Sequence, residues 1–327
     1  MSEPFAIGTF SRDGERFPGL VLGGERVHDL RPALGDAVTT RRRLEDWERS
    51  FARLRELAAG GLGAGTAMAG LRAEVPVDPP GQVLCAGANY RRHLTQMHFA
   101  FERRNGNDLP DDELWAASAA YVEELAAKGT PYVFPALSGA LSGANDDVVL
   151  FGPGTDHDWE LELAVVIGKP AWRASRERAM EHVAGYTMSN DVSTRDVMHR
   201  PNFPMTDFMA TKIRPTFFPT GPFLVPAAFV PDPYDLRVTL KVNGEVMQDE
   251  STSDIIFGVE RLVAYASTLI VLRPGDLLLT GSPAGNAAHH GNRWLRPGDV
   301  MEGEITGLGV QRNVCVDESS FRPEGVG

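Results

Sequence analysis

The chain has 327 residues, and 32 lysines and arginines against 44 aspartates and glutamates give it a formal net charge of −12 at pH 7. A hydrophobic content of 43% is that of a globular protein with a sizeable core, which excludes disorder as the main state. The acidic balance argues against nucleic acid or an anionic membrane as a partner, because either would require a basic surface.

Cysteines and apolar runs narrow the class of protein further. Two cysteines, Cys85 and Cys315, are too few for a disulfide framework or a thiolate metal cage. The N-terminus lacks the basic start and apolar run of a signal peptide. The longest apolar stretch, 262–272, is much shorter than the roughly 20 residues that a membrane span requires. We therefore expect a cytoplasmic protein without a membrane partner.

The first part of the chain predicts a small N-terminal α/β module, 1–78, in front of a larger domain. Short strands joined by glycine turns are expected over 5–29, and apolar residues three to four apart predict one helix over 39–60. Sequence rich in Gly, Ala and Pro over 60–81 is typical of a linker. The main domain is then expected over 79–327.

Strands dominate the rest of the chain, with a few helices between them. Buried strands are expected near 82–89 and over 159–170, and the Asn-Gly pair at 243–244 predicts a hairpin. Helices are expected over 175–185, with Gly185 as terminator, and over 253–272. Because long alternation of single strands and helices is missing from the sequence, the pattern favours an α+β fold over a doubly wound sheet.

The strand predicted over 159–170 carries two carboxylates with a spacing of two. Residues two apart on a strand share a face, so Glu160 and Glu162 would point to one side and Leu161 to the other. Hard oxygen donors at a fixed spacing suit Mg²⁺, Mn²⁺ or Ca²⁺. Taken alone, the same alternation is more often an amphipathic strand with one solvated face.

Polar loops supply further candidates for a site. Asp191 follows a strand and offers a third oxygen ligand, and Arg195 could grip a carboxylate with two hydrogen bonds. Lys212 precedes a proline-rich extended segment and could stabilise a developing negative charge. His93 can act as a general base near neutral pH. An Asx turn, a solvated lysine and a surface histidine are the ordinary alternatives for these residues.

Two more features lie near the C-terminus. The small-residue loop at 280–285 would expose backbone N–H groups and the hydroxyl of Ser282 to a ligand, although a plain turn has the same sequence. His289 and His290 are adjacent, and adjacent side chains do not face the same way. We therefore interpret that pair as an exposed loop.

The order and spacing of these features closely resemble those of the fumarylacetoacetate hydrolase superfamily. The resemblance runs from about 82 to 313 and rests on the runs NYRRH, DWELELAVVIGK, GYTMSNDVSTRD, the lysine before FFPTGP, VNGEVMQ, RPGDLLLTGSPAG and LRPGDVMEGEITGLG. It implies an α+β fold of the mixed β-sandwich or β-roll type that is usually homodimeric. The N-terminal module also resembles the small domain that many members carry in front of this core.

The resemblance implies that Glu160, Glu162 and Asp191 hold Mg²⁺ or Mn²⁺, with Ca²⁺ as an in vitro substitute. Implied substrates are small 2-oxo acids with a second carbonyl, such as acylpyruvates and fumarylpyruvate, which points to aromatic compound catabolism. The leading expectation is a hydrolase that cleaves a C–C bond through a metal-stabilised enolate. A decarboxylase or isomerase on the same scaffold is the alternative, and a non-catalytic member that binds a keto acid is the third reading.

The family pattern also implies roles for individual residues. His93, on a segment that closes over the site in relatives, would activate water, and Lys212 would lie near the developing charge. Contacts to the substrate are expected from Tyr90, Gln96, Arg195, Met198, Arg214 and Ser282.

Departures from the family pattern bear on the reaction. Gln96 stands where many hydrolases have Glu, and a Gln can orient water but cannot accept a proton. Met198 replaces a usual Gln, and Arg214 lies beside the position of a usual Asp. The segment 99–131 is longer than in compact relatives, and we expect its helix to cover the pocket as an inserted lid and to set substrate specificity.

Overall fold

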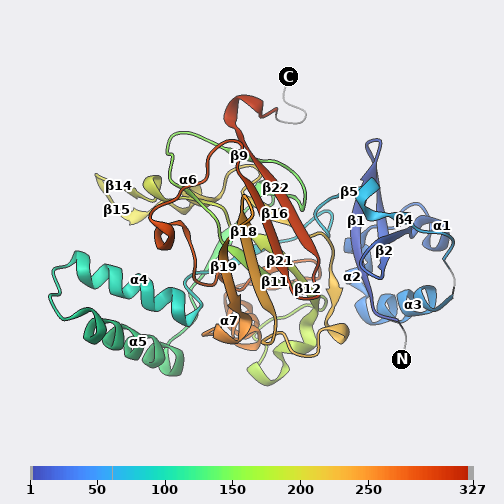
Figure 1. Ribbon diagram of the computed structural model, residues 1–327. Coiled ribbons are helices and arrows are strands. Elements are labelled where there is room, and N and C mark those ends of the chain that lie inside the picture. The colour runs from blue at the N-terminus through green and yellow to red at the C-terminus, as the bar shows by residue number, and fades with distance from the viewer. Residues whose placement is uncertain (1–2, 61, 323–327) are drawn as a thin grey trace.

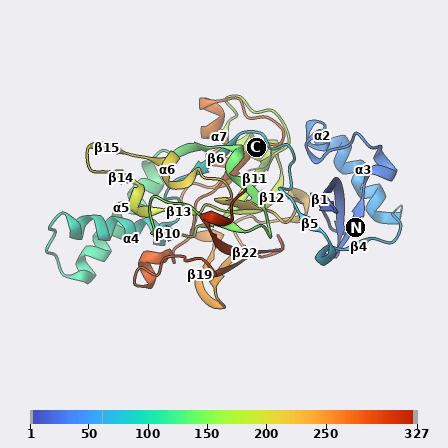
Figure 2. The ribbon, with the colours of Figure 1, turned by 90° about the horizontal axis from the view of Figure 1, so that it is seen from above.

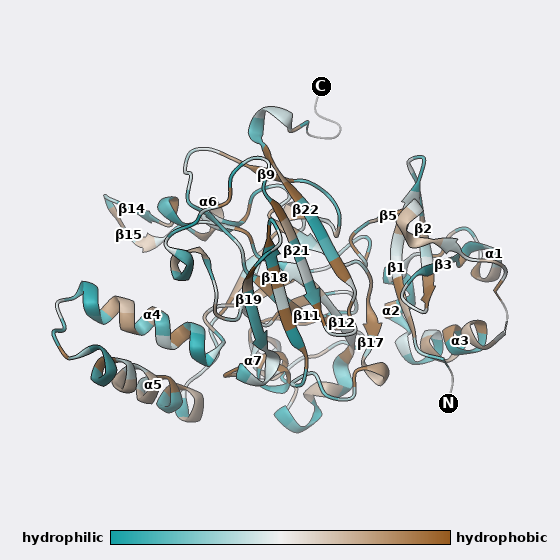
Figure 3. Ribbon diagram, viewed as in Figure 1, coloured by the Kyte–Doolittle hydropathy of each residue, from teal (hydrophilic) through white to brown (hydrophobic). Residues whose placement is uncertain are grey.

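The computed structural model describes residues 3–60 and 62–322. A small sheet formed by N-terminal residues lies at one end of the molecule, a pair of helices lies at the other, and a larger β body separates them (Figures 1 and 2). The strands of the body mix hydrophobic and hydrophilic residues along their lengths (Figure 3). Among the described residues, none of the helices is both long and apolar enough to cross a membrane.

The N-terminal sheet has the strand order β4-β3-β2-β1-β5. Its longest pairing is an antiparallel hairpin whose register runs from Phe5 opposite Leu22 to Arg12 opposite Glu15. The strands are β1 (Phe5–Arg12), β2 (Glu15–Leu22), β3 (Arg26–Asp29), β4 (Thr66–Ala67) and β5 (Arg72–Ala73), and the helices beside them are α1 (Arg31–Leu34), α2 (Thr40–Glu45) and α3 (Trp47–Gly60).

The single helix expected over 39–60 is two helices. Asp46 leaves the helical region with φ −134° and ψ 69°, which ends α2, and its carbonyl then accepts a hydrogen bond from the N–H of Ser50 at 2.9 Å in α3. Thr39 caps α2 by accepting from the N–H of Arg42. The apolar spacing predicted the buried face correctly, because Leu44, Leu54 and Leu57 are buried.

The larger body contains two sheets. The first is a mixed sheet with the order β7-β6-β20-β11-β12-β16-β8, in which β17 also pairs with β12. The second has the order β19-β18-β21-β22-β9 and is antiparallel except for the parallel pair of β22 and β9. The strands of the first sheet are β6 (Val83–Ala86), β7 (Val133–Ala136), β8 (Leu141–Gly143), β11 (Leu161–Ile167), β12 (Val183–Asn190), β16 (Phe218–Thr220), β17 (Val225–Pro226) and β20 (Leu277–Leu279). Those of the second are β9 (Val148–Leu150), β18 (Arg237–Val242), β19 (Glu245–Ser251), β21 (Val300–Ile305) and β22 (Val310–Asp317).

Strand β11 is the centre of the first sheet. It pairs with β12 on one side and β20 on the other, and all of its residues are buried. Its leucines join one continuous hydrophobic core that includes residues of both sheets, and the side chain of Leu161 approaches Gly303 of β21. Short ribbons β10 (His157–Asp158) with β13 (Ser193–Thr194), and β14 (His199–Arg200) with β15 (Phe203–Thr206), extend the body. The predicted α+β fold class is confirmed.

The helix expected over 175–185 is wrong in its last three residues, which belong to β12. A 3-10 helix covers Arg176–His182, and Gly185 lies inside β12, where it pairs with Val166 of β11 and Pro226 of β17. Sheet pairing on both sides of β12 overrides the helical character of the local sequence. The helix expected over 253–272 is shorter, since α7 spans Val259–Leu269.

Helices α4 (Arg91–Arg104) and α5 (Asp111–Lys128) pack against each other as an antiparallel pair. Leu114, Ser118 and Val122 form the buried face of α5. His98 of α4 lies within hydrogen-bonding distance of Ser118, 3.0 Å away, and stacks on Tyr121 with 4.2 Å between ring centroids. Helix α5 therefore supports α4 from behind. The short helix α6 (Phe208–Lys212) follows the β14–β15 ribbon.

The pairing of β12 predicts a cost for any side chain at position 185. A Cβ built on Gly185 would lie 2.1 Å from the carbonyl oxygen of Val225, which is backbone and cannot rotate away. Gly185→Ala should therefore lower the free energy of unfolding by about 1–3 kcal/mol or more, measured by urea denaturation. Gly139→Ala is the control, because nothing lies within 4 Å of a Cβ at that position; equal stability of the two variants would contradict this packing.

Candidate metal centre and active site

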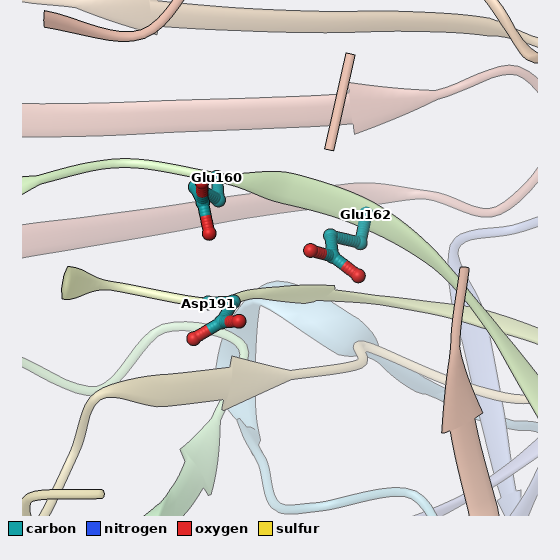
Figure 4. A group of neighbouring side chains, drawn as sticks. All are labelled: Glu160, Glu162 and Asp191. Atoms are coloured by element: carbon teal, nitrogen blue, oxygen red, sulfur yellow. The ribbon is translucent and has the colours of Figure 1, made fainter. Parts of the chain in front are cut away.

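Three carboxylates meet where β11 begins and β12 ends. Leu161 pairs with Asn190, so the next positions outward, Glu160 and Asp191, lie opposite each other, and the N–H of Asp191 donates to the carbonyl of Glu160 at 2.8 Å. Glu162 lies two residues along the strand and faces the same side. Figure 4 shows the three side chains converging, and oxygen atoms of all three lie within 4.8 Å of one another.

Two cations border this group. The Nζ of Lys212, at the end of α6, donates to Oε2 of Glu160 at 2.5 Å and to Oδ2 of Asp191 at 2.6 Å. Arg195 donates through Nη2 to Oε1 of Glu160 at 2.7 Å and through Nε to Oδ2 of Asp158 at 2.9 Å. Pairing of β10 with β13 brings Asp158 and Arg195 together.

The charges of this buried group do not balance without a further cation. Asp158 and the three clustered carboxylates are each less than a tenth exposed, and among the described residues their salt-bridge partners are Lys212 and Arg195. Buried charges require compensation, so the site has a deficit of two positive charges when all four acids are ionised. The Oδ1 of Asp191 is also buried and has no hydrogen-bond partner within residues 3–60 and 62–322. A divalent cation bound by oxygen ligands fits both observations.

The pKa values of the acids express the same imbalance. Burial, followed by the charges of Asp191 and Glu160, holds the pKa of Glu162 well above its usual range. Burial likewise raises the pKa of Asp191 to about 6 against the opposing effect of Lys212. Burial opposes ionisation of Glu160 too, but Arg195 and Lys212 outweigh it and lower the pKa of this carboxyl. Protons therefore compete with a metal mainly at Glu162 and Asp191.

Loops distant in the sequence hold the carboxylates in place. The N–H of Gly281 donates to Oε2 of Glu162 at 2.7 Å. Gly281 has φ +94°, and a Cβ there would lie 2.8 Å from the Cβ of Asn89, so glycine is required at this position. The side chain of Gln248 links the N–H of Leu161 to the hydroxyl of Ser282, with distances of 3.1 Å and 2.9 Å. The hydroxyl expected to face a ligand is therefore already hydrogen-bonded.

A cavity of about 590 Å³ opens from the carboxylates. Most of the residues predicted from the sequence line it: His93, Gln96, Glu160, Glu162, Asp191, Arg195, Met198, Lys212 and Ser282. Tyr90 and Arg214 are not part of its wall. Tyr90 is fully buried, and Arg214 donates to the carbonyls of Ala210 and Gly152, so their positions give no support to the predicted contacts with substrate.

His93 and Gln96 project from the first turns of α4 toward the charged end of the cavity. Burial lowers the pKa of His93 to about 4, so its imidazole is neutral at pH 7. The Nδ1 of His93 and the Oε1 of Gln96 are both buried without a partner in the described part of the chain. Two such atoms beside a cavity are suited to bind a polar group of a ligand or a water molecule.

Sequence reasoning missed several residues of this wall. His289 is exposed, as predicted, but it also lines the cavity, with its ring perpendicular to that of His93 and 6.2 Å between centroids. Asp158 and Asn286, which donates to the carbonyl of Trp159, also line the cavity. Asp158 could have been predicted from the sequence, because it lies two residues before Glu160 and would share a face with it on a strand. No local pattern indicated that His289 would line the cavity.

The segment 99–131 reaches the cavity only through α4. Ala100 and Arg104 line the wall, and α5 contributes no residue to it within the described chain. The remaining wall is largely aromatic and aliphatic and includes Tyr132, Phe134 and Phe208.

Known proteins that are similar to this chain include two hydrolases and a tautomerase. A 2,4-didehydro-3-deoxy-L-rhamnonate hydrolase of Sphingomonas sp. (strain SKA58) is 33% identical over 312 residues, which are 93% of each chain. A human mitochondrial oxaloacetate tautomerase, FAHD2B, is 34% identical over 74% of this chain and 68% of its own. The crystal structure of maleylpyruvate hydrolase from Sphingobium sp. SYK-6, in complex with manganese(II) ion and pyruvate, is 26% identical with a TM-score of 0.72 and covers 95% of this chain and 99% of that chain.

The model of the fumarylacetoacetate (FAA) hydrolase C-terminal family matches residues 82–316. These residues include both sheets of the body and every carboxylate of the cluster. The match covers well over half of the chain, and the chain belongs to the fumarylacetoacetate hydrolase family.

Proposed function

We propose that the protein is a divalent-metal-dependent hydrolase that cleaves the C–C bond next to the distal carbonyl of a 2,4-dioxo acid. The observation that carries this proposal is the buried carboxylate cluster with its deficit of positive charge, which opens into a cavity that His93 and Lys212 also line. Support comes from two relatives that are hydrolases of 2-oxo acids, one of them with manganese and pyruvate bound. We propose Mg²⁺ or Mn²⁺ as the ion.

The proposed reaction adds water to the distal carbonyl. The C–C bond then breaks, its electron pair remains on the pyruvate part as an enolate, and the other part leaves as a carboxylic acid. A bound divalent cation supplies Lewis-acid stabilisation of negative charge on the 2-oxo oxygen. Lys212 adds a fixed positive charge at the same place, because its Nζ lies within 2.6 Å of Asp191.

His93 and Gln96 act on the water in this scheme. The neutral imidazole of His93 takes the proton from the attacking water, and the amide of Gln96 holds that water without accepting its proton. Arg195 uses Nε and Nη2 on Asp158 and Glu160, so Nη1 is the nitrogen that remains for a substrate carboxylate. Its first role is to keep Glu160 ionised and in position.

A tautomerase or isomerase is the second candidate, and Gln96 favours it. Moving a proton between C3 and the 2-oxo oxygen requires one group that carries a proton and no activated water. His93 alone can carry it, and the human relative is an oxaloacetate tautomerase. The decarboxylase alternative has no specific support from the wall of the cavity.

Metal binding gives the first prediction. Mn²⁺ at 100 times its Kd should stabilise the fold by about 2.7 kcal/mol through mass action and raise Tm by several degrees, measured by calorimetry. Glu160→Ala/Glu162→Ala should abolish the rise. The control is Glu302→Ala/Glu304→Ala, which has the same spacing on β21 away from the cavity. A rise that survives in the first variant would place the ion elsewhere.

The pH dependence of metal binding follows from the raised pKa of Asp191. Below pH 6 this carboxyl holds a proton that the metal must displace, so affinity falls as pH decreases and rises toward pH 7.5. We expect the Kd for Mn²⁺ at pH 5 to be at least tenfold weaker than at pH 7.5, about one decade per pH unit for each displaced proton. Titration calorimetry measures both values, with circular dichroism as a check that the fold persists. A constant Kd would contradict the assignment.

A substitution at position 96 should affect the two candidate reactions differently. Gln96→Glu should increase the release of pyruvate from acetylpyruvate by tenfold or more, since general-base assistance is typically worth about 10²–10⁴-fold. The same change should leave the decay of enol-oxaloacetate within a few-fold. His93→Gln should reduce both rates. If wild-type protein ketonises oxaloacetate and Gln96→Glu gains no hydrolysis, the tautomerase reading replaces the hydrolase.

A further inference from the structure

The cavity continues beyond the carboxylates along α4, and this extension is apolar. We infer that the extension, here named the acyl chamber, binds a hydrophobic acyl chain or ring of the substrate. Met97 and Ala100 of α4 line it together with Tyr132, Phe134 and Phe208. The inference rests on the proposed function, because it takes the keto-acid head of the substrate to lie at the carboxylates.

One face of α4 grades from polar to apolar. The helix residues on the wall are His93, Gln96, Met97, Ala100 and Arg104. Each lies three or four positions from another member of the set, so together they occupy one helical face. His93 and Gln96 lie at the charged end. Along the helix axis, Met97 lies about 6 Å and Ala100 about 10 Å from His93, at about 1.5 Å per residue. Substrate atoms beyond the distal carbonyl would therefore meet aliphatic side chains.

The facing wall is aromatic and begins next to the charged end. The rings of Phe134 and Phe208 are stacked with centroids 4.6 Å apart, and Tyr132 lies 6.2 Å from Phe208. The Nζ of Lys212 is 5.8 Å from the centroid of the Phe134 ring, so the aromatic side chains begin directly beside the charged group. Met198 stands on the same wall at the position where relatives are expected to have a polar Gln.

Size and charge favour a hydrophobic group over a second carboxylate. A cavity of about 590 Å³ is in the range that takes drug-sized ligands, about 300–1,000 Å³, and exceeds what a three-carbon keto acid would fill. Beyond Ala100 the next cation of this helix face is Arg104, whose Cα lies about 16 Å from that of His93 along the axis. The second carboxylate of a short dioic acid would lie beside Met97, Ala100 and the aromatic rings, whose side chains carry no positive charge to pair with it.

The first test compares substrates that differ only in the acyl group. Acetylpyruvate, 2,4-dioxooctanoate, 2,4-dioxo-4-phenylbutanoate and fumarylpyruvate are assayed for pyruvate release with Mn²⁺-loaded protein. We expect kcat/KM to increase about fourfold for each added methylene, the usual gain from burying one, and to be lowest for fumarylpyruvate relative to its size. A preference for fumarylpyruvate, or equal values for the first two acids, would overturn the acyl chamber.

A variant with a larger side chain at position 100 tests whether the acyl group binds beside α4. Ala100→Trp should remove the advantage of 2,4-dioxooctanoate over acetylpyruvate, measured as the ratio of their kcat/KM values. Ala100 is exposed on one side of α4, so the larger side chain does not enter the hydrophobic core. Phe101→Trp is the matched control, since Phe101 is its neighbour on α4, is 54% exposed and does not line the cavity. If Ala100→Trp keeps the wild-type preference for 2,4-dioxooctanoate, the acyl group does not bind beside Ala100.

A binding measurement keeps the inference separate from the proposed reaction. Titration calorimetry measures the Kd of the protein for pyruvate and for 2-oxooctanoate. These values do not depend on whether the protein catalyses C–C cleavage or tautomerisation. We expect at least tenfold tighter binding of 2-oxooctanoate, and loss of that difference in Ala100→Trp. Equal Kd values would reject the acyl chamber. Absence of turnover with every dioxo acid, combined with tighter binding of 2-oxooctanoate, would instead reject the proposed hydrolysis alone.

Discussion

The compensation of buried negative charge at the open ends of β11 and β12 is the constraint on which the rest of this structure depends. Four carboxylates lie almost fully out of water, and each would be strongly unfavourable alone. Lys212 and Arg195 neutralise part of the group. The remaining deficit explains why Glu162 and Asp191 have raised pKa values and why a divalent cation suits the site. The acidic net charge of the whole chain therefore says little about this pocket, where Lys212, Arg195 and a divalent ion together would balance the four carboxylates.

The surrounding fold serves to hold that group. The antiparallel register of β11 and β12 sets Glu160 and Asp191 opposite each other, and the second sheet contributes Gln248, whose amide joins β11 to the loop after β20. On the other side, Asn89 donates to the carbonyl of Thr280 and so fixes the start of the same loop. The result is a rigid charged end and a less constrained apolar end formed by a single helix and an aromatic wall. Such a division lets substrate range vary through α4 and its neighbours without disturbing the carboxylates.

The sequence was informative where local periodicity and chemistry coincide. Alternation on one strand placed Glu160 and Glu162 together, and the polar turn after the next strand supplied Asp191. Position 185 shows the opposite case, because pairing with both neighbouring strands decides the conformation there and no local pattern records it. The stack of Phe134 on Phe208 and the approach of His289 to His93 join segments far apart in the chain, so they depend on the tertiary fold. Arg214 was predicted to contact the substrate, but its guanidinium donates hydrogen bonds to two backbone carbonyls, those of Ala210 and Gly152.

The long sequence separations within the site have a consequence for how the protein matures. Asn89 and Thr280 are 191 positions apart, and Glu162 and Gly281 are 119 apart, yet both contacts are needed to shape one ligand group. Contacts of this kind form late and slow the folding of a chain. During synthesis the carboxylates would thus remain without their supporting loop until nearly the whole polypeptide had left the ribosome. The ion would stabilise a finished sheet in this protein, in contrast to small zinc domains, where the metal nucleates the fold.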